Sequence, residues 1–233
     1  MQPDRSSAPV GIVGMHRSGT SCLAGSLEEA GLFLGDVNTA APFNKRGNRE
    51  NRAIMDLHDD VLRANGGSWD VVPERVEWND AQRRRLDELI AAYPADRAWG
   101  FKEPRSLLVL DRWLEVLPQL RLVGTFRHPA AVAASLAHRN QFEPARSYAL
   151  WLAYNRRLIA YQRRYGFPLV NFDWPPARYL RALESLVRAL GLTPPADGFQ
   201  FFTTELRSNQ AASDAALPRE VAETYDTLLS LAA

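Results

Sequence analysis

The sequence predicts an α/β fold, with a P-loop-like central parallel β-sheet flanked by helices on both faces. Short apolar segments such as LRLVGTF alternate along the chain with segments whose apolar residues recur every three or four positions. The first pattern is typical of buried strands and the second of amphipathic helices. Strands and helices that alternate in this order form a parallel sheet covered by helices on both sides.

The first half of the chain predicts two strands and four helices. PVGIVGM is short and apolar, and the segment after it has helical spacing. Apolar residues recur at the same spacing from Ile54 to Leu62, and Gly66 follows as glycine does at a helix C-terminus. Asn79 is a helix-capping residue. The expected elements are a strand at 9–15, helices at 19–32, 50–65 and 79–93, a strand at 98–102 and a helix at 106–117.

The second half predicts two further strands and four helices. LRLVGTF is the clearest buried strand, and Pro129 stands at the first position of the helix behind it, where no N–H donor is needed. The segments 34–48 and 192–214 are rich in loop-forming residues, and loops of that length in a compact domain are often functional. The expected elements are strands at 120–126 and 168–172 and helices from 129, at 145–165, at 177–190 and at 215–232.

Length and composition indicate one ordinary globular domain. The 233 residues are 46% hydrophobic and 24% charged, which suits a single domain over 1–233, with 1–8 expected to be disordered. These values exclude disordered, collagen-like and disulfide-scaffold proteins. No apolar segment approaches the roughly 18 residues of a membrane span, and no secretory signal is evident. We therefore expect a cytoplasmic protein, whose single cysteine fits a reducing compartment.

Basic side chains are concentrated in the middle of the chain, although the net charge is only +1. Residues 101–165 carry eleven Lys and Arg against four Asp and Glu, which predicts an anionic ligand near that segment. Lys102 is one of only two lysines in the sequence, so a specific role is expected for it. Nucleic acid is not an expected partner, because no basic stretch alternates with aromatic residues.

The strongest local motif is Gly14-Met-His-Arg-Ser-Gly-Thr-Ser21, between the first strand and the first helix. Backbone N–H groups in such a turn, together with the positive end of the helix behind it, form a cradle for an anion. The spacing of Gly14 and Gly19 is that of a P-loop. Thr20, however, stands where a nucleotide triphosphatase has the lysine that reaches the β- and γ-phosphates. Arg17 supplies a positive charge from inside the loop instead, which indicates a different phosphate-like group.

A second motif, Arg127-His-Pro-Ala-Ala-Val-Ala-Ala-Ser135, directly follows the strand LRLVGTF. Arg127 is thereby placed at the carboxyl end of a strand, the edge where open α/β sheets bind ligands. Ser135 lies about two turns into the next helix. Alone, an arginine at this position is often a structural ion-pair partner. Together with the loop at 14–21, it predicts a ligand that is anionic at both ends.

GMHRSGTS followed by FRHPAAVAASL resembles the sulfotransferases that use 3′-phosphoadenosine 5′-phosphosulfate (PAPS). The resemblance extends through FNKRGNRE, WGFKEPR and ALWLAYNRRL, which are similar to a bacterial branch that often acts on carbohydrates, and covers roughly residues 9–210. It implies transfer of the sulfuryl group from PAPS to a hydroxyl or amine of a small molecule or glycan, a carbohydrate or natural product. It also implies that no catalytic metal is needed.

The resemblance further implies which residues bind PAPS. Arg127 and Ser135 match the motif that holds the 3′-phosphate. Cytosolic members often carry lysine where this chain has Arg17; arginine keeps the charge but offers a planar fork of donors instead of a single ammonium. The residues that match the 5′-phosphosulfate loop are His16, Arg17, Ser18, Gly19, Thr20 and Ser21.

Three residues are candidates for catalysis: Arg17, Lys102 and Glu50. Sulfuryl transfer, like phosphoryl transfer, needs positive charge at the leaving oxygen, and Arg17 and Lys102 are the candidates for supplying it. A general base must also take a proton from the acceptor. Family members without a catalytic histidine place a glutamate in the region of Glu50, although a carboxylate there also suits the first turn of a helix. Glu103 and His128 remain alternative bases.

Two other functions stay open on the sequence. One is a P-loop nucleotide or small-molecule kinase, which lacks the loop lysine and has only Asp173 as a candidate Mg²⁺-binding acid. The other is a non-catalytic nucleotide-binding protein, which gains if Glu50, Lys102 and Glu103 lie far from the nucleotide. No metal site is expected, because the four histidines have no zinc-like spacing with Cys22.

Recognition of the acceptor is expected from the loops around 34–48 and 66–78. Their aromatic residues offer flat apolar platforms that suit sugar rings and phenols equally. A late segment, 201–210, is expected to fold back over the nucleotide, with Arg207 as an extra phosphate contact. The identity of the acceptor and the oligomeric state stay open. The candidate platforms are Phe43, Trp69 and Trp78.

Overall fold

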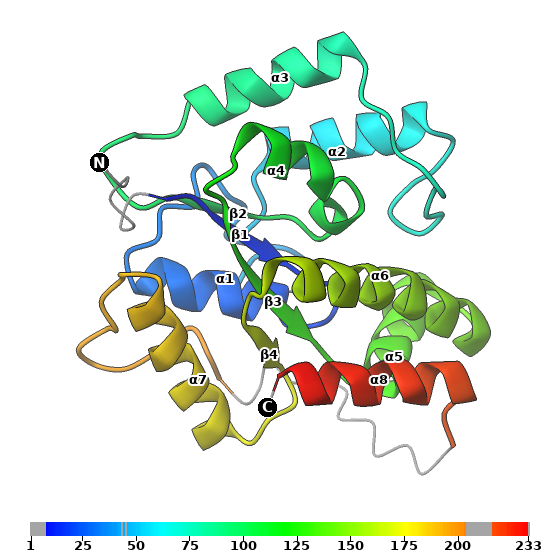
Figure 1. The fold of residues 1–233 in the computed structure, drawn as a ribbon. Helices are drawn as coiled ribbons and strands as arrows, with labels where there is room; N and C mark the ends of the chain where they lie inside the picture. The colour runs from blue at the N-terminus through cyan, green and yellow to red at the C-terminus, as the bar shows by residue number, and fades with distance from the viewer. Residues whose placement is uncertain (1–7, 43, 45, 204–215, 233) are drawn as a thin grey trace.

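The computed structural model describes residues 8–42, 44, 46–203 and 216–232. They form a four-stranded parallel sheet between two layers of helices (Figure 1). The strand order is β2-β1-β3-β4, so the first strand of the chain lies inside the sheet. The predicted fold class is confirmed. The strands are β1 (Val10–Val13), β2 (Gly100–Lys102), β3 (Arg121–Phe126) and β4 (Leu169–Asn171).

The helices follow the order that the sequence predicts, with small differences at their ends. They are α1 (Thr20–Glu29), α2 (Arg52–Ala64), α3 (Asp80–Ala91), the 3-10 helix η1 (Pro104–Leu108), α4 (Leu110–Val116), α5 (Pro129–Asn140), α6 (Pro144–Tyr165), α7 (Pro176–Ala189) and α8 (Arg219–Leu231). None of these helices is both long and apolar enough to cross a membrane.

The two faces of the sheet are covered by different helices. Successive residues of a strand point to opposite faces, and β1 shows this directly. Ile12 packs in a core with Leu23 of α1 and Tyr179 of α7. Val13, its neighbour, packs in a second core with Trp113 of α4 and with residues of α2, α3, α5, α6 and α8. Because both faces are covered, every residue of β1 is buried, as expected of a parallel sheet.

Two helix boundaries differ from the sequence-based expectation. The helix expected at 106–117 is divided into η1 and α4, because Val109 between them has a φ of −126°, outside the helical range. The helix expected from Glu50 begins two residues later. The side chain of Asn51 accepts hydrogen bonds from the N–H groups of Ala53 and Ile54, which makes Asn51 the N-cap. Glu50 therefore precedes the helix, and its interpretation as a first-turn carboxylate is wrong.

The C-terminal helix α8 docks on its own domain, against α6 and β4 (Figure 1). Its Val221 and Leu228 are buried in the core on that face. The ring of Tyr225 makes edge-to-face contacts with Phe126 at the end of β3 and with His128 behind it. Helix α8 thereby covers part of the sheet edge at which β3 and β4 end.

Replacing Gly14 tests the close approach of the turn after β1 to β3. Its φ is +155°, and an added Cβ would overlap the backbone carbonyl oxygen of Thr125. We expect Gly14→Ala to lower the free energy of unfolding by about 3 kcal/mol, since backbone strain and overpacking add. Gly31→Ala is the matched control: its φ is +97° but open space surrounds it, so about 1 kcal/mol is expected. Urea unfolding measures both, and equal losses would contradict the close approach.

Candidate active site

The four parallel strands end at one edge of the sheet, and each brings polar groups to it. The loop 14–19 follows β1, and Lys102 is the last residue of β2. Arg127 directly follows β3, and Asp173 lies two residues past β4. Neighbouring strands end nearly level, because Ile12 pairs with Lys102 in the ladder. Residues far apart in the sequence thus meet at this edge.

The loop after β1 is held in a compact turn between α1 and β3. Gly14, Arg17 and Gly19 have positive φ angles of 155°, 67° and 84°. The hydroxyl of Thr125 on β3 donates a hydrogen bond of 3.0 Å to the carbonyl of Ser18. Helix α1 begins directly after Gly19, so the unpaired N–H groups of its first turn lie at the loop. This arrangement fits an anion-binding cradle.

Arg17 joins the two sequence motifs. Its Nε donates a hydrogen bond of 2.7 Å to the Oγ of Ser135 on α5. Burial lowers the pKa of the Arg17 guanidinium, and the nearby charges of Arg139 and Arg127 lower it further. Guanidinium groups from the loop, from the end of β3 and from α5 therefore act on one another at short range. Such a concentration of positive charge favours an anionic ligand.

Two buried polar atoms of the loop have no hydrogen-bond partner among the described residues: Ser18 Oγ and His16 Nε2. Buried polar groups are normally paired, because an unsatisfied one costs free energy. The ring of His16 lies edge-on to Trp69, with centroids 4.8 Å apart. Burial first, and then the charge of Arg105, lower the pKa of His16 well below its usual value. These unsatisfied atoms fit a loop that binds a polar ligand.

Arg127 is 3% exposed and is oriented by Asp173. Its Nε lies 3.2 Å from Asp173 Oδ1, and the backbone N–H of His128 donates to the other carboxylate oxygen at 2.7 Å. The guanidinium carbon also lies 5.4 Å from the centroid of the Phe172 ring. Asp173, the acid that a kinase would use for Mg²⁺, is thus engaged with Arg127. In the described part of the chain, no cluster of three His, Cys, Asp or Glu residues suits a metal.

Lys102 forms a buried ion pair with Glu50 beside the loop. The lysine side chain is 1% exposed and that of Glu50 is 11% exposed. Lys102 Nζ lies 2.6 Å from Glu50 Oε1 and 3.4 Å from the Oγ of Ser21 in α1. Burial lowers the pKa of the Lys102 ammonium, which the Glu50 carboxylate opposes. Two of the three candidate catalytic residues, Lys102 and Glu50, therefore lie beside the loop motif.

The segment before α2 is fixed by Asn38. Its side-chain oxygen accepts hydrogen bonds from the N–H groups of Asn48, at 3.0 Å, and Glu50, at 3.2 Å. Its backbone N–H donates to the carbonyl of Glu50 at 3.2 Å, and its own carbonyl accepts from the N–H of Arg49. Arg49 has a φ of 56°, and its Nε lies 2.9 Å from Glu28 on α1. These contacts hold Glu50 next to Lys102.

The two alternative bases have other partners. Glu103 is 0% exposed, and its carboxylate oxygens contact His58 and Arg105. The Nδ1 of His128 accepts a hydrogen bond from the N–H of Ala130, which caps α5. Burial lowers the pKa of His128, although Asp173 opposes this. Of the two candidate carboxylates, Glu50 retains some contact with solvent and Glu103 does not.

The aromatic residues proposed as acceptor platforms differ in their surroundings. Trp69 is half-buried, beside His16 of the loop and stacked on Phe142. Trp78 is 9% exposed, packs in the core and also lines a cavity that no residue of the loop reaches. Phe43 and Arg207 lie outside the described residues, as do residues 1–7 of the segment 1–8 that was expected to be disordered; Ala8 is described.

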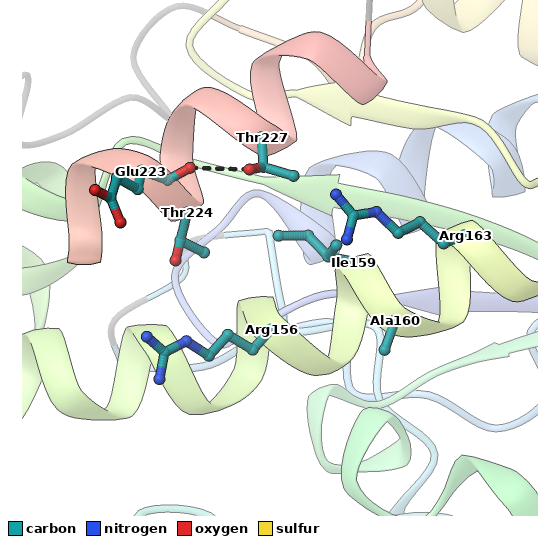
Figure 2. A pocket seen from close by; sticks show the side chains of 7 residues that line it. All are labelled: Arg156, Ile159, Ala160, Arg163, Glu223, Thr224 and Thr227. Atoms are coloured by element: carbon teal, nitrogen blue, oxygen red, sulfur yellow. Dashed lines mark hydrogen bonds between the residues drawn. The ribbon is translucent and has the colours of Figure 1, made fainter.

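Two cavities lie apart from the motif residues. One, of about 300 Å³, lies between α6 and α8, where Arg156 and Arg163 face Thr224 and Thr227 (Figure 2). The other, of about 570 Å³, is lined by the segment 74–78 and by charged residues of α3 and α4. No residue of the loop or of the Arg127 motif lines either cavity.

Sequence reasoning missed Asn38 and His58 as residues that organise the site. It also missed that Asp173 orients Arg127. Asn38 lies in a loop-rich stretch and acts through contacts that close only in the folded chain. His58 sits on the apolar side of α2, where it looks like one more core residue. A histidine at a core position is nevertheless a signal, because its ring needs a partner when buried.

A family model described as the sulfotransferase family matches residues 9–181. The chain belongs to the sulfotransferase family. The match includes the loop at 14–21, the Arg127–Ser135 motif, Glu50 and Lys102. The recognition made from the sequence motifs is therefore confirmed at the level of the family.

One solved sulfotransferase domain shares the fold, and two further structures give lower scores. The sulfotransferase domain of the Synechococcus PCC 7002 olefin synthase superposes with a TM-score of 0.62 at 20% identity, covering 98% of each chain. A sulfotransferase from Mycobacterium tuberculosis H37Rv gives 0.47 at 15% identity, covering 96% of this chain and 77% of its own. A retinol dehydratase solved with androsterone and the inactive cofactor PAP gives 0.42 at 15%, covering 88% and 64%. A search of curated proteins gave no match.

Family membership makes the protein an enzyme, a PAPS-dependent sulfotransferase. The kinase hypothesis is thereby replaced, in agreement with Thr20 in the loop and with the pairing of Asp173 to Arg127. PAPS carries anionic groups at its 5′ and 3′ ends, and the loop and Arg127 provide positive charge at two neighbouring places on the sheet edge. The buried unsatisfied atoms of the loop are consistent with such a ligand.

Removing the hydroxyl of Ser135 tests whether the two motifs act on one ligand. We expect Ser135→Ala to weaken binding of 3′-phosphoadenosine 5′-phosphate (PAP) roughly 10-fold to 100-fold, because a hydrogen bond to a charged group is lost. Ser185→Ala on the exposed side of α7 is the matched control and leaves the affinity unchanged. Calorimetric titration gives both dissociation constants. Equal affinities in the two variants would show that Ser135 takes no part.

Proposed function

We propose that the protein acts as a single domain that transfers the sulfuryl group of PAPS to a hydroxyl, or an amine, of a carbohydrate or natural product. Glu50 is the general base, and Lys102 and Arg17 neutralise charge on the leaving group. The observation that carries the proposal is the 2.6 Å contact between Lys102 and Glu50, beside Ser21 of the loop. It supports the proposal because a carboxylate and a buried ammonium group lie next to a serine of the loop motif.

The donor is held at two places in this proposal. The 5′-phosphosulfate lies in the loop, where N–H groups of the first turn of α1 and the hydroxyl groups of Ser18 and Ser21 surround it. The 3′-phosphate lies at Arg127 and Ser135, at the carboxyl end of β3. The 2.7 Å contact between Arg17 and Ser135 supports the proposal, because it sets the two anion sites next to each other.

The reaction requires that the donor and the acceptor are positioned in line and that the charge on the leaving oxygen is neutralised. The bond between sulfur and the 5′-phosphate oxygen breaks as a bond from sulfur to the acceptor oxygen forms, and Glu50 takes the acceptor proton. Negative charge grows on the leaving phosphate oxygen, where Lys102 and Arg17 offset it. Lys102 is buried and Arg17 is half-buried, and charges act more strongly where water is excluded.

The acceptor approaches next to Trp69 in this proposal. The indole lies against His16 of the loop, so a ring stacked on its open part would reach toward the sulfuryl group. A carbohydrate acceptor rests on the resemblance of FNKRGNRE, WGFKEPR and ALWLAYNRRL to the carbohydrate branch. The one cysteine of the sequence, Cys22, is buried, which is in keeping with a cytoplasmic location.

A non-catalytic nucleotide-binding protein, the other alternative that the sequence left open, disagrees with membership of the sulfotransferase family. It would gain if Glu50 and Lys102 lay far from the phosphate loop. The contact from Lys102 to Ser21 and the ion pair to Glu50 argue against it. A protein that only binds a nucleotide does not need a buried lysine such as Lys102. It also does not need a partly exposed carboxylate, Glu50, as the partner of that lysine.

Substitution of the base and the cation tests the proposal directly. We expect Glu50→Gln to lower kcat about 10²-fold to 10⁴-fold and Lys102→Met to lower it about 10²-fold to 10³-fold. Glu184→Gln on the exposed face of α7 is the control. The measurement is release of PAP from PAPS in the presence of a panel of sugars and phenols. Turnover by Glu50→Gln at the rate of the control would rule out Glu50 as the base.

A further inference from the structure

We propose that Phe201 is a positioning residue for the general base: its ring, packed on α1, holds Arg49 and with it the segment that carries Glu50. The inference rests on the proposed function, because it gives Glu50 the role of base. Phe201 comes from the loop after α7, far from Glu50 in the sequence. The inference therefore assigns a role to a loop that the reaction itself leaves unused.

Phe201 packs directly against the backbone of α1. The residue is 5% exposed, although it lies outside the helices and strands. Gly25 of α1 makes the close contact possible, since a Cβ added there would lie 2.4 Å from two atoms of the Phe201 ring. Only glycine at this position leaves room for the ring where it lies. The ring is therefore fixed on the helix.

Two arginines of the segment before α2 contact the same ring. The guanidinium carbon of Arg49 lies 5.0 Å from the centroid of the Phe201 ring, and that of Arg46 lies 5.5 Å from it. At such distances a cation is attracted to the aromatic ring. Nη1 of Arg46 also donates a hydrogen bond to the carbonyl of Gln200. Contacts with the ring and with the backbone therefore join the two segments.

One face of α1 supports this contact and also borders the active site. Ser21, Gly25 and Glu28 are spaced by four and three residues, so they share one face of the helix. Gly25 lies against the Phe201 ring, and the Glu28 carboxylate lies 2.9 Å from Nε of Arg49. Ser21 lies on the same face at the end next to the phosphate loop. The arginine, the ring and the site are thus fixed to one rigid element.

Arg49 determines where Glu50 lies, because the two residues are adjacent and Arg49 has an unusual backbone conformation. Its φ of 56° costs free energy for a residue other than glycine and persists only where the surroundings hold it. The surroundings include Phe201 at the side chain and the carbonyl of Asn38, which accepts from the Arg49 N–H at 3.2 Å. Without the ring the backbone relaxes, and Glu50 loses its position 2.6 Å from Lys102.

The donor site does not include this contact. In the proposed function the 3′-phosphate lies at Arg127 and Ser135, which belong to the end of β3 and to α5. The 5′-phosphosulfate lies in the loop after β1. Loss of the Phe201 ring should therefore slow the reaction while PAP still binds. A fall in kcat without a change in PAP affinity is the expected signature of a displaced base.

The test compares two buried phenylalanines of equal exposure. Phe201→Leu should lower kcat about 10-fold to 100-fold, because a displaced catalytic group loses much of its effect, and should leave the dissociation constant of PAP unchanged. Phe167→Leu, shortly before β4, is the matched control, since Phe167 is also 5% exposed and packs in the core. It should lose stability in urea but keep wild-type kcat. Equal kcat values for the two variants, from release of PAP with the panel of sugars and phenols, would overturn the inference.

Gly25→Ala displaces the ring without removing it. Alanine favours a helix more than glycine does, so α1 is retained, but the added methyl group occupies the place of the ring. We expect kcat to fall by a similar factor. The double variant with Phe201→Leu should be no slower than the slower single variant, because both changes remove the same contact. Two effects that multiply would show independent actions and would contradict the inference.

Substitution of Arg49 tests the second step. Arg49→Gln removes the charge next to the ring and should lower kcat about 10-fold or more, whereas Arg49→Lys keeps a cation there and should retain more of the turnover. Equal losses would contradict a role for the charge. Wild-type turnover by Glu50→Gln would overturn the proposed base and this inference together. Loss of turnover in Glu50→Gln with normal turnover in Phe201→Leu would overturn this inference alone.

Discussion

The parallel register of four short strands is the constraint on which the site depends. Strand β1 lies between β2 and β3, so the loop after it is flanked by Lys102 on one side and by Arg127 on the other. The residues that follow parallel strands lie at one common edge of the sheet. The contact between Arg17 and Ser135, 118 positions apart in the chain, exists because the sheet brings them there. A shift of β1 in register would separate the loop after it from both Lys102 and Arg127.

A second feature of the site is the number of charged side chains that are buried. Lys102, Glu103 and Arg127 are each no more than 3% exposed. Buried ion pairs contribute little net stability, because desolvation offsets their attraction. Each of these three groups has a partner of opposite charge, so none imposes the larger cost of an isolated buried ion. Charged groups retained in such a place are better explained by chemistry than by folding.

Much of this organisation was predictable from the sequence, because the signals were local. LRLVGTF and the helical periodicities predict the sheet and its helices, and the order of strands and helices predicts that the sheet is parallel. The Gly14–Gly19 spacing predicts the loop. What the sequence could not give were contacts that close only in the folded chain. Asn38 reaches Glu50 across a loop, and the ion pair of Asp173 with Arg127 joins the ends of two strands.

The differences from the sequence-based expectations have the same origin. The start of α2 depends on which side chain can accept the free N–H groups, and Asn51 does so better than Glu50. Trp78 is as aromatic as Trp69, and only the fold decides that one packs in the core while the other borders the loop. His58 gives no local sign of its two partners, Trp113 and Glu103, which come from other elements.

The central claim is that one site binds a nucleotide with a 5′ and a 3′ anionic group. Calorimetric titration with PAP and with 5′-AMP, each with and without EDTA, tests it most directly. We predict tight binding of PAP that is independent of metal and far weaker binding of 5′-AMP, with Arg127→Ala abolishing the difference. Equal binding of PAP and 5′-AMP, or binding only of ATP with Mg²⁺, would contradict the account.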